Sequence, residues 1–206
     1  MFWRKTELEY HILIPPIDKS FECFTEQEAQ AYFDWFINAI DHRVEYLKQV
    51  SSIDLNYSVK SLTDIWGWFL SHAEIEKAPS IKKSELKKQL KSFPREIRNA
   101  ILDEQREQFT LQTEYILRDI AMYFGEVYIR NNPSIHWGFH TDINQDSFAN
   151  MPVLMGFEDR DFSPPFKAYF ELNFILRGLA CNVFDGDQKK TDLLDMYKIW
   201  QRMVFD

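Results

Sequence analysis

The sequence predicts an α+β fold, a predominantly helical single domain in which a small antiparallel β-hairpin or sheet packs on a long helix. Apolar residues recur at helical spacing through most of the chain, but between about 135 and 157 they alternate with other residues at strand spacing. The chain has 206 residues and contains no internal repeat and no Pro/Gly/Ser-rich linker. One domain spanning 1–206 is therefore expected.

A capping box predicts the start of the first helix. Thr25 and Glu28 have the Thr-x-x-Glu spacing in which each side chain accepts a hydrogen bond from the backbone N–H of the other residue. The helix is expected from about Glu26 to Gln49. Its apolar stripe is Phe33, Phe36, Ile40, Val44 and Leu47. Before it, alternating apolar positions predict a short strand that ends at Pro15. These positions are Leu8, Tyr10, Ile12 and Ile14.

Two further helical regions are expected in the middle of the chain. One begins near Ser61, with Leu62, Ile65, Trp66 and Phe69 on one side. Residues 77–98 are expected to form a basic helical segment. Beyond Pro94, helical spacing predicts one long helix from Arg95, with a bend or interruption near Phe109 to Leu111 and an end before Asn131.

The period of the apolar residues changes after this long helix. Ile135, Trp137 and Phe139 alternate with other residues, as do Val153, Met155 and Phe157, so these two runs predict an antiparallel strand pair. Pro164 and Pro165 open a third helical region. Its apolar residues are Phe166, Phe170 and Phe174, at four-residue spacing. A turn is predicted at Asp185 and Gly186, and a final helix with Thr191 as its N-cap.

The charge of the chain is unevenly distributed. The net charge is −8, but residues 77–98 hold eight Lys or Arg against two Glu, a local balance of +6 that leaves −14 for the remainder. A mainly acidic body repels phosphate, so a nucleic-acid partner is not expected. An acidic surface attracts a basic protein partner instead.

Several other sequence features limit the class of protein to which the chain can belong. The longest stretches without a charged residue contain 11 residues, against about 20 needed to span a bilayer, and the N-terminus does not resemble a secretory signal. A cytoplasmic protein without a membrane partner is expected. Cys23 and Cys181 lack any CxxC spacing and are expected to be buried thiols. The sequence carries no signal for an oligomeric state.

Short catalytic and nucleotide-binding motifs are absent from the sequence. The six glycines do not form GxGxxG or a P-loop, and GxSxG and HExxH are missing, so no cofactor is expected. His136, His140 and Asp142 first suggest a metal site. If the two histidines lie on a strand, however, they are about 13 Å apart, which is too far for one ion. We therefore expect no metal.

The most distinctive segment is Tyr123-Phe124-Gly125-Glu126-Val127-Tyr128, followed by Trp137. A glycine within a helix costs about 1 kcal/mol relative to alanine, and this usually marks the close approach of another backbone. Trp137 is the neighbour that we expect over Gly125. The stretch from about 114 to 140 resembles uncharacterised bacterial proteins, some of them from toxin and immunity gene neighbourhoods. The resemblance implies a bacterial α+β domain and assigns no catalytic residue.

Two functions remain open from the sequence. The first is a non-catalytic protein-binding domain of bacterial origin, such as an immunity-type inhibitor with an acidic surface. Its candidate binding residues are Trp35, Trp68, Trp137 and Tyr123. The alternative is a small hydrolase or transferase with a site where the long helix meets the strand pair. Its candidate catalytic residues are Glu126, His136, His140 and Asp142.

Overall fold

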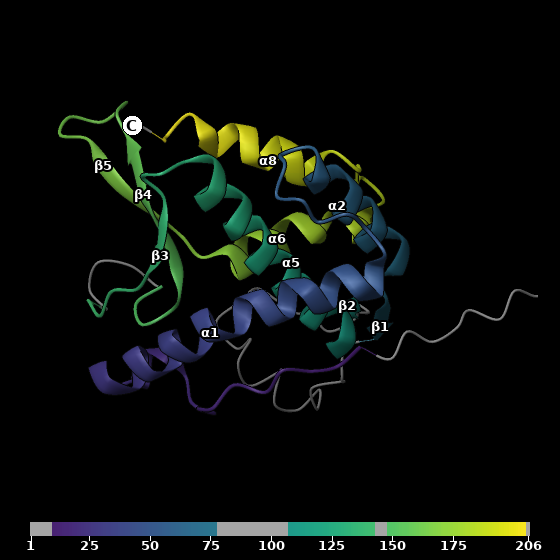
Figure 1. The fold of residues 1–206 in the computed structure, drawn as a ribbon, viewed down its shortest axis with the longest axis horizontal. Helices are drawn as coiled ribbons and strands as arrows, with labels where there is room; N and C mark the ends of the chain where they lie inside the picture. Colours follow the sequence, from purple (N-terminus) through teal and green to yellow (C-terminus); the bar gives the residue numbers. More distant parts are fainter. Residues whose placement is uncertain (1–9, 78–106, 143–147, 205–206) are drawn as a thin grey trace, which may run out of the picture.

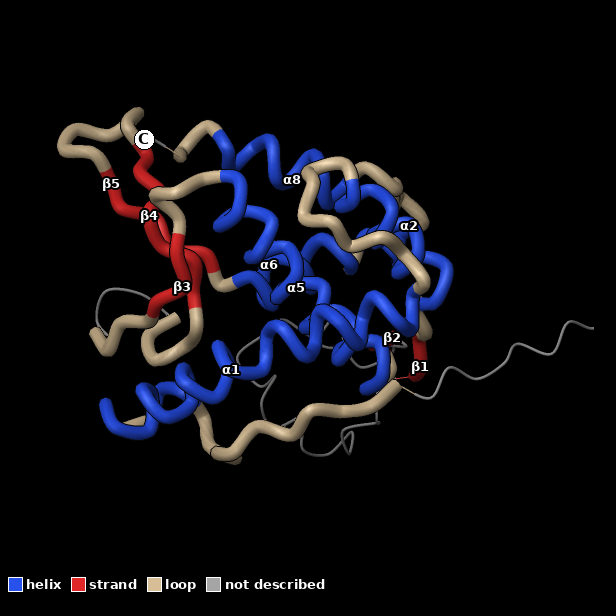
Figure 2. Tube along the Cα trace, in the orientation of Figure 1, coloured by secondary structure: helices blue, strands red, loops and turns tan. Residues whose placement is uncertain are grey.

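The computed structural model describes residues 10–77, 107–142 and 148–204. Helices make up most of the described chain, and a small antiparallel sheet lies at one end of the helical body (Figure 1). A second, two-stranded sheet lies at the opposite end, as the strands drawn in red in Figure 2 show. The predicted α+β class is confirmed. Among the described residues, no helix is both long enough and apolar enough to cross a membrane.

Helix α1 (Glu26–Ser51) confirms the first predicted helix. The Thr25 hydroxyl accepts from the Glu28 N–H, and the Glu28 carboxylate accepts from the Thr25 N–H, so the capping box is complete. The helix ends where Ser52 adopts a left-handed conformation with φ 56°. Its buried stripe faces the core. The buried members are Ala29, Phe36, Ile40, Arg43, Val44, Leu47 and Ser51.

The middle of the chain differs from the prediction. Helix α2 (Ser61–His72) is confirmed, but Glu107–Phe109 is not helical and forms strand β2, which pairs with β1 (Ile75–Lys77). Thr110 then caps a separate helix, α5 (Leu111–Asn131), by accepting from the Thr113 N–H. The extended backbone of a capping residue cannot continue a helix through position 110. The predicted basic helix 77–98 lies, apart from Lys77, outside the described residues.

The larger sheet confirms the predicted strand pair and adds a third strand. β3 (His136–Gly138), β4 (Val153–Asp159) and β5 (Phe166–Phe170) pair antiparallel in that order. The helical prediction for Phe166 to Phe170 was wrong. A spacing of four residues keeps side chains on one face of a strand as well as of a helix, so this spacing alone does not distinguish the two. Helix α6 (Leu172–Ala180) begins only after Glu171, whose carboxylate caps it.

The C-terminal part follows the predicted order. The short helix α7 (Asn182–Asp185) ends at Gly186, which has a φ of 74°, and α8 (Asp192–Gln201) follows. Thr191 precedes α8 as predicted, although its hydroxyl accepts no backbone hydrogen bond there. Beyond α8, Val204 forms an isolated bridge with Phe157 of β4. The end of the described chain is therefore tied to the larger sheet.

The chain contains 18 Phe, 9 Tyr and 6 Trp, and many of these aromatic residues are in the core. α5 is central to this core, and the ring of Tyr128 stacks on that of Tyr197 with 4.4 Å between centroids. The largest fully buried aromatic side chains are Trp66, Tyr123, Tyr128, Phe69, Phe124, Phe157 and Phe170. The expectation of two buried thiols was wrong for Cys23, which is exposed on a 3₁₀ turn (Phe21–Cys23), and Cys181 is partly buried.

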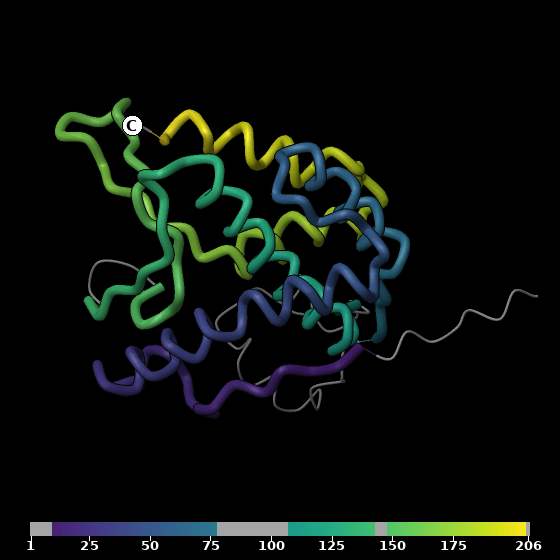
Figure 3. The backbone as a smooth tube through the Cα atoms, viewed as in Figure 1, coloured from purple at the N-terminus to yellow at the C-terminus, as the bar shows by residue number. Residues whose placement is uncertain are grey.

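The predicted strand from Leu8 to Ile14 is also corrected. Leu8 lies outside the described residues, and positions 10–14 form no ladder with a neighbouring strand. Residues 10–24, called the 10–24 segment below, run along α1 in Figure 3. Side chains of other elements hold the backbone of this segment. Tyr46 accepts from the His11 N–H at 2.8 Å, and Gln112 accepts from the Tyr10 N–H at 3.2 Å.

The capping box should make stability depend on pH. Hydrogen bonds from the Lys19 ammonium and the Thr25 N–H lower the pKa of Glu28 from 4.5 to about 2. A lowered pKa in the folded state stabilises the fold above about 4.5, and this contribution disappears as the pH falls toward about 2. In thermal unfolding, Glu28→Gln should therefore melt below the wild type at neutral pH and together with it at about pH 2. A gap between the two melting temperatures that stays constant with pH would contradict this.

Candidate functional site

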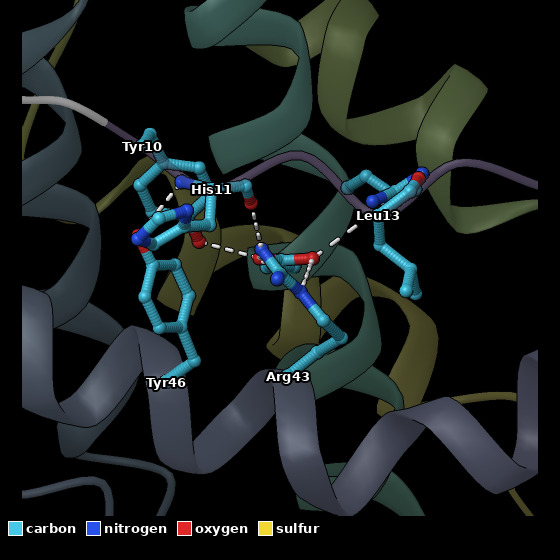
Figure 4. Close-up of polar contacts among 7 residues, drawn as sticks. Tyr10, His11, Leu13, Arg43 and Tyr46 are labelled. Carbon is cyan, nitrogen blue, oxygen red and sulfur yellow. Dashed lines mark hydrogen bonds and ion pairs between the residues drawn. The ribbon is translucent and has the colours of Figure 1, made fainter.

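A buried ion pair joins α1 to α5 beneath the 10–24 segment (Figure 4). Arg43 Nε donates to the two carboxylate oxygens of Asp119 at 3.1 and 3.0 Å, and Arg43 Nη2 donates to Asp119 Oδ2 as well. The two side chains are 3% and 0% exposed. The Tyr10 hydroxyl also donates to Asp119 Oδ2, and Arg43 Nη2 donates to the carbonyl of His11 at 2.9 Å.

The electrostatics of this cluster favour a structural role. Burial raises the pKa of Asp119, and the hydrogen bonds from Arg43 and Tyr10 oppose that rise. Burial and the nearby Asp119 carboxylate raise the pKa of Tyr10. Each carboxylate oxygen already accepts hydrogen bonds from these neighbours. Asp119 therefore binds the 10–24 segment and α1 rather than presenting a free carboxylate to a substrate.

Arg118 supports the same segment from α5. Its Nη1 donates to the carbonyl of Leu13 at 2.9 Å, and its guanidinium lies 4.8 Å from the centre of the Tyr115 ring. Glu114 and Arg118 have the i,i+4 spacing of a helical ion pair, but no ion pair joins these two described residues. Glu114 instead accepts from Arg177 Nε of α6 at 2.9 Å, because Arg118 is turned toward the 10–24 segment.

The joint between α5 and β3 is built around Gly125. A Cβ atom at Gly125 would lie 2.1 Å from Trp137 Cζ2, so the indole occupies the space that any side chain there would need. Trp137 Nε1 donates to Glu126 Oε1 at 3.1 Å, and its ring meets that of Phe36 edge-on at 5.1 Å. The expected contact between Gly125 and Trp137 is confirmed. The neighbour that excludes a side chain is the indole itself rather than a backbone.

The four residues of the hydrolase hypothesis point in different directions. Glu126 accepts from Trp137 Nε1 and forms an i,i+4 ion pair with Arg130, whose Nε lies 3.6 Å from Glu126 Oε2. His136 precedes Trp137 on β3, so its side chain lies on the opposite face of the strand, where it is exposed. Within the described residues, no hydrogen bond or ion pair joins Glu126 to His136.

The two remaining candidates lie beyond β3. The His140 ring stacks on Tyr169 of β5 with 4.9 Å between centroids, and Asp142 is exposed. In the part of the chain that is described, no three His, Cys, Asp or Glu side chains are grouped closely enough to hold a metal ion. The structure therefore does not assemble an acid–base pair from Glu126 and His136.

The predicted aromatic binding residues divide into two groups. Tyr123 is fully buried, and its hydroxyl accepts from the Tyr57 N–H at 3.0 Å, so it is not available at the surface. Trp137 packs over Gly125 and donates to Glu126, so its indole is used within the fold. Trp35 and Trp68 are only partly buried. The ring of Trp35 lies 5.2 Å from Tyr32, and that of Trp68 stacks on His72 at 4.6 Å.

The solvent side of α1 carries an acidic face, defined here as Asp34, Asn38, Asp41 and Glu45. At 100° per residue these four positions fall within one narrow sector of the helix, Lys48 lies at its C-terminal margin, and all five are exposed. Gln30 donates to Asp34, and Gln49 donates to Glu45. Among the described residues, no Lys or Arg forms an ion pair with the three carboxylates. The face therefore presents its charge to solvent.

Exposed phenylalanines form a second surface feature, which the sequence did not single out. Phe162 lies in the turn that joins β4 to β5, Phe166 is the first residue of β5, and their ring centres are 6.4 Å apart. Phe174 lies in the first turn of α6, just after β5. The four-residue spacing of Phe166, Phe170 and Phe174 predicted one face of a helix, and the sequence made no prediction for Phe162.

The buried pair Arg43–Asp119 was also missed, although a signal was present. Arg43 lies on the apolar stripe of α1 beside Ile40 and Leu47. Asp119 lies next to Ile120 on the apolar stripe of α5. One unpaired charge on a buried stripe is costly, so opposite charges on the stripes of two helices predict a buried pair. Which helices pack together is not visible in the sequence.

Comparison with known proteins identifies no relative. No protein-family model, curated protein sequence or solved structure matches the chain significantly.

Proposed function

We propose that this chain is a non-catalytic protein-binding domain that binds a basic protein partner on the acidic face of α1. The observation that carries the proposal is the absence of ion pairs at Asp34, Asp41 and Glu45 among the described residues, although these carboxylates share one exposed helix face. Concentrated charge of one sign steers a partner of the opposite sign and aligns it on contact.

The acidic face costs the isolated helix some stability. Asp41 and Glu45 are four residues apart, and like charges at this spacing destabilise a helix by about 0.2–0.5 kcal/mol. A basic partner would remove this repulsion, since its cations would lie between the carboxylates. The arrangement is therefore more favourable in a complex than in the free domain.

Trp35 supplies an anchor beside this face. It follows Asp34 on α1, and its ring packs on Tyr32 while part of its surface remains open. Partly buried tryptophans next to charged rims commonly contribute much of the energy of an interface. The resemblance of residues 114 to 140 to bacterial proteins from toxin and immunity gene neighbourhoods makes a basic toxin the partner class that we propose, with inhibition in the cytoplasm as the function.

The proposal is tested by matched charge reversals. The variant Asp34→Lys/Asp41→Lys/Glu45→Lys changes the acidic face, whereas Asp64→Lys/Asp187→Lys/Asp195→Lys makes the same change of net charge at exposed positions elsewhere. Each immobilised full-length chain is exposed to extract of the source cells at low salt, and the captured proteins are identified. The affinity of the purified partner is then measured.

The expected result is a basic partner that the wild type and the control variant retain and the acidic-face variant loses, with retention falling as salt rises. Equal loss in both variants would mean that net charge alone governs binding. Equal retention in both would place the partner on another surface. Either outcome would contradict the proposal.

A further inference from the structure

Strand β5 (Phe166–Phe170) forms the outer edge of the larger sheet (Figure 2). The central strand β4 pairs with β3 on one side and with β5 on the other. Beyond the end of β3, this edge of β4 is paired as well, because the Glu158 N–H donates to the Met203 carbonyl at 2.8 Å. Among the described residues, the backbone of β5 hydrogen-bonds within the sheet to β4 alone. No described residue pairs with the N–H and C=O groups of its other edge. An open strand edge of this kind is a template for a further strand.

Exposed phenylalanines lie at both ends of this edge. Phe162 and Phe166, at its start, are 62% and 61% exposed, and Phe174, just after its end, is 67% exposed. Large apolar side chains grouped around an open strand edge mark an interaction surface rather than scattered surface residues. Apolar side chains lie at both ends of the β5 edge. An antiparallel strand that also carries apolar side chains at both of its ends would therefore cover them.

We propose that β5 pairs antiparallel with β5 of a second copy of this chain, with Ala168 opposite Ala168 on a two-fold axis. In such a pair the start of one strand lies beside the end of the other, so a surface that carries phenylalanines at both ends is complementary to itself. This arrangement brings the turn before β5 of one copy, which carries Phe162, toward the start of α6 of the other copy, which carries Phe174. The two larger sheets then become one continuous sheet across the dimer.

The side chains of β5 fit this register. Lys167 lies opposite Tyr169 of the second copy, so no like charges meet across the new strand pair, and an ammonium beside an aromatic ring is favourable. Ala168 on the axis leaves room for its own copy. Asp159 ends β4, and Asp161 lies in the turn that follows. In the proposed dimer this turn approaches the first turn of the second copy's α6, where the positive end of the helix dipole favours carboxylates.

This pairing is independent of the partner proposed for α1, because it uses a different element. A strand from an unrelated protein could also pair with β5, but such a strand has no reason to carry aromatic residues at both ends in this register. Self-association separates the two cases, since it requires only the purified chain.

The mass of the full-length chain is measured by sedimentation equilibrium over a range of concentrations. The wild type should shift from one chain toward two chains as concentration rises. Phe174→Glu and Phe162→Glu should each raise the dimer dissociation constant at least about tenfold. Leu111→Glu replaces a side chain of matched exposure, 62%, at the start of α5 and should leave the constant unchanged. Circular dichroism checks that each variant is folded.

A paired change tests the register directly. Phe162→Lys/Phe174→Glu places opposite charges across the axis and should bind more tightly than Phe162→Glu/Phe174→Glu, which places like charges there. A second test uses Ala168→Cys in a chain with Cys23→Ser and Cys181→Ser. Opposed Cα atoms in an antiparallel pair are about 4.5–5.5 Å apart, within the range for a disulfide, so oxidation should cross-link the two copies.

The proposal is overturned if the wild type remains one chain at every concentration. It is also overturned if a dimer forms that Phe174→Glu does not weaken, or one that residue 168 does not cross-link, because that dimer would use another surface.

Discussion

Asp119→Ala should lower the free energy of unfolding by about 3–5 kcal/mol, the usual cost of removing one partner from a buried ion pair. The guanidinium of Arg43 would remain in the core without its anion, and the Tyr10 hydroxyl would lose its acceptor. Urea denaturation followed by circular dichroism measures the loss.

Glu114→Ala is the matched control for this variant. Glu114 is on the same helix and accepts from Arg177 at 2.9 Å, but that pair is at the surface and should contribute at most about 1 kcal/mol. The triple variant Tyr10→Phe/Arg43→Met/Asp119→Leu replaces the buried cluster by apolar groups and should recover at least half of the loss. If Asp119→Ala and Glu114→Ala prove equally mild, the buried cluster does not hold the fold together.

Gly125→Ala should destabilise the protein by about 1–3 kcal/mol, although alanine is the better helix former. The new methyl group would lie 2.1 Å from Trp137 Cζ2 if nothing moved. The indole has little freedom to give way, because it packs against Phe36 and donates to Glu126. The loss is measured by denaturation, and the fluorescence of Trp137 should report its displacement.

A double-mutant cycle isolates this clash. In a Trp137→Ala background the space above position 125 is empty, so Gly125→Ala should become neutral or stabilise by up to about 1 kcal/mol. A Gly125→Ala effect of the same sign and size in both backgrounds would mean that the indole is not its cause. Gly178→Ala is the control, because a Cβ at that helical position meets no atom within 4 Å.

The parts of the fold that depend on neighbouring residues were predictable from the sequence. The capping box at Thr25, the apolar stripes of α1 and α2 and the alternation in β3 and β4 each lie within a few residues of chain. The contact of Trp137 with Gly125 was also predictable, because a glycine in a helix and a tryptophan in the next strand are separated by one short connection.

The errors arose where a local pattern was ambiguous or where distant segments decide the structure. The spacing of Phe166 and Phe170 fits a strand as well as a helix, and pairing with β4 decides between them. Residues 107–109 pair with β1, thirty or more positions earlier, and α5 begins directly after them with Thr110 as its N-cap. The partners of Arg43 and of the 10–24 segment depend on the packing of α1 against α5. This packing cannot be predicted from any short stretch of the sequence.

The 10–24 segment also determines an order of assembly. Its backbone is held by Arg43 and Tyr46 of α1 and by Gln112 and Arg118 of α5, and the Tyr10 N–H and its acceptor Gln112 are 102 positions apart in the chain. These side chains converge only after the two helices have packed together. During synthesis this segment leaves the ribosome before either helix, yet it can be fixed only after both, so the earliest described part of the chain is among the last to reach its place.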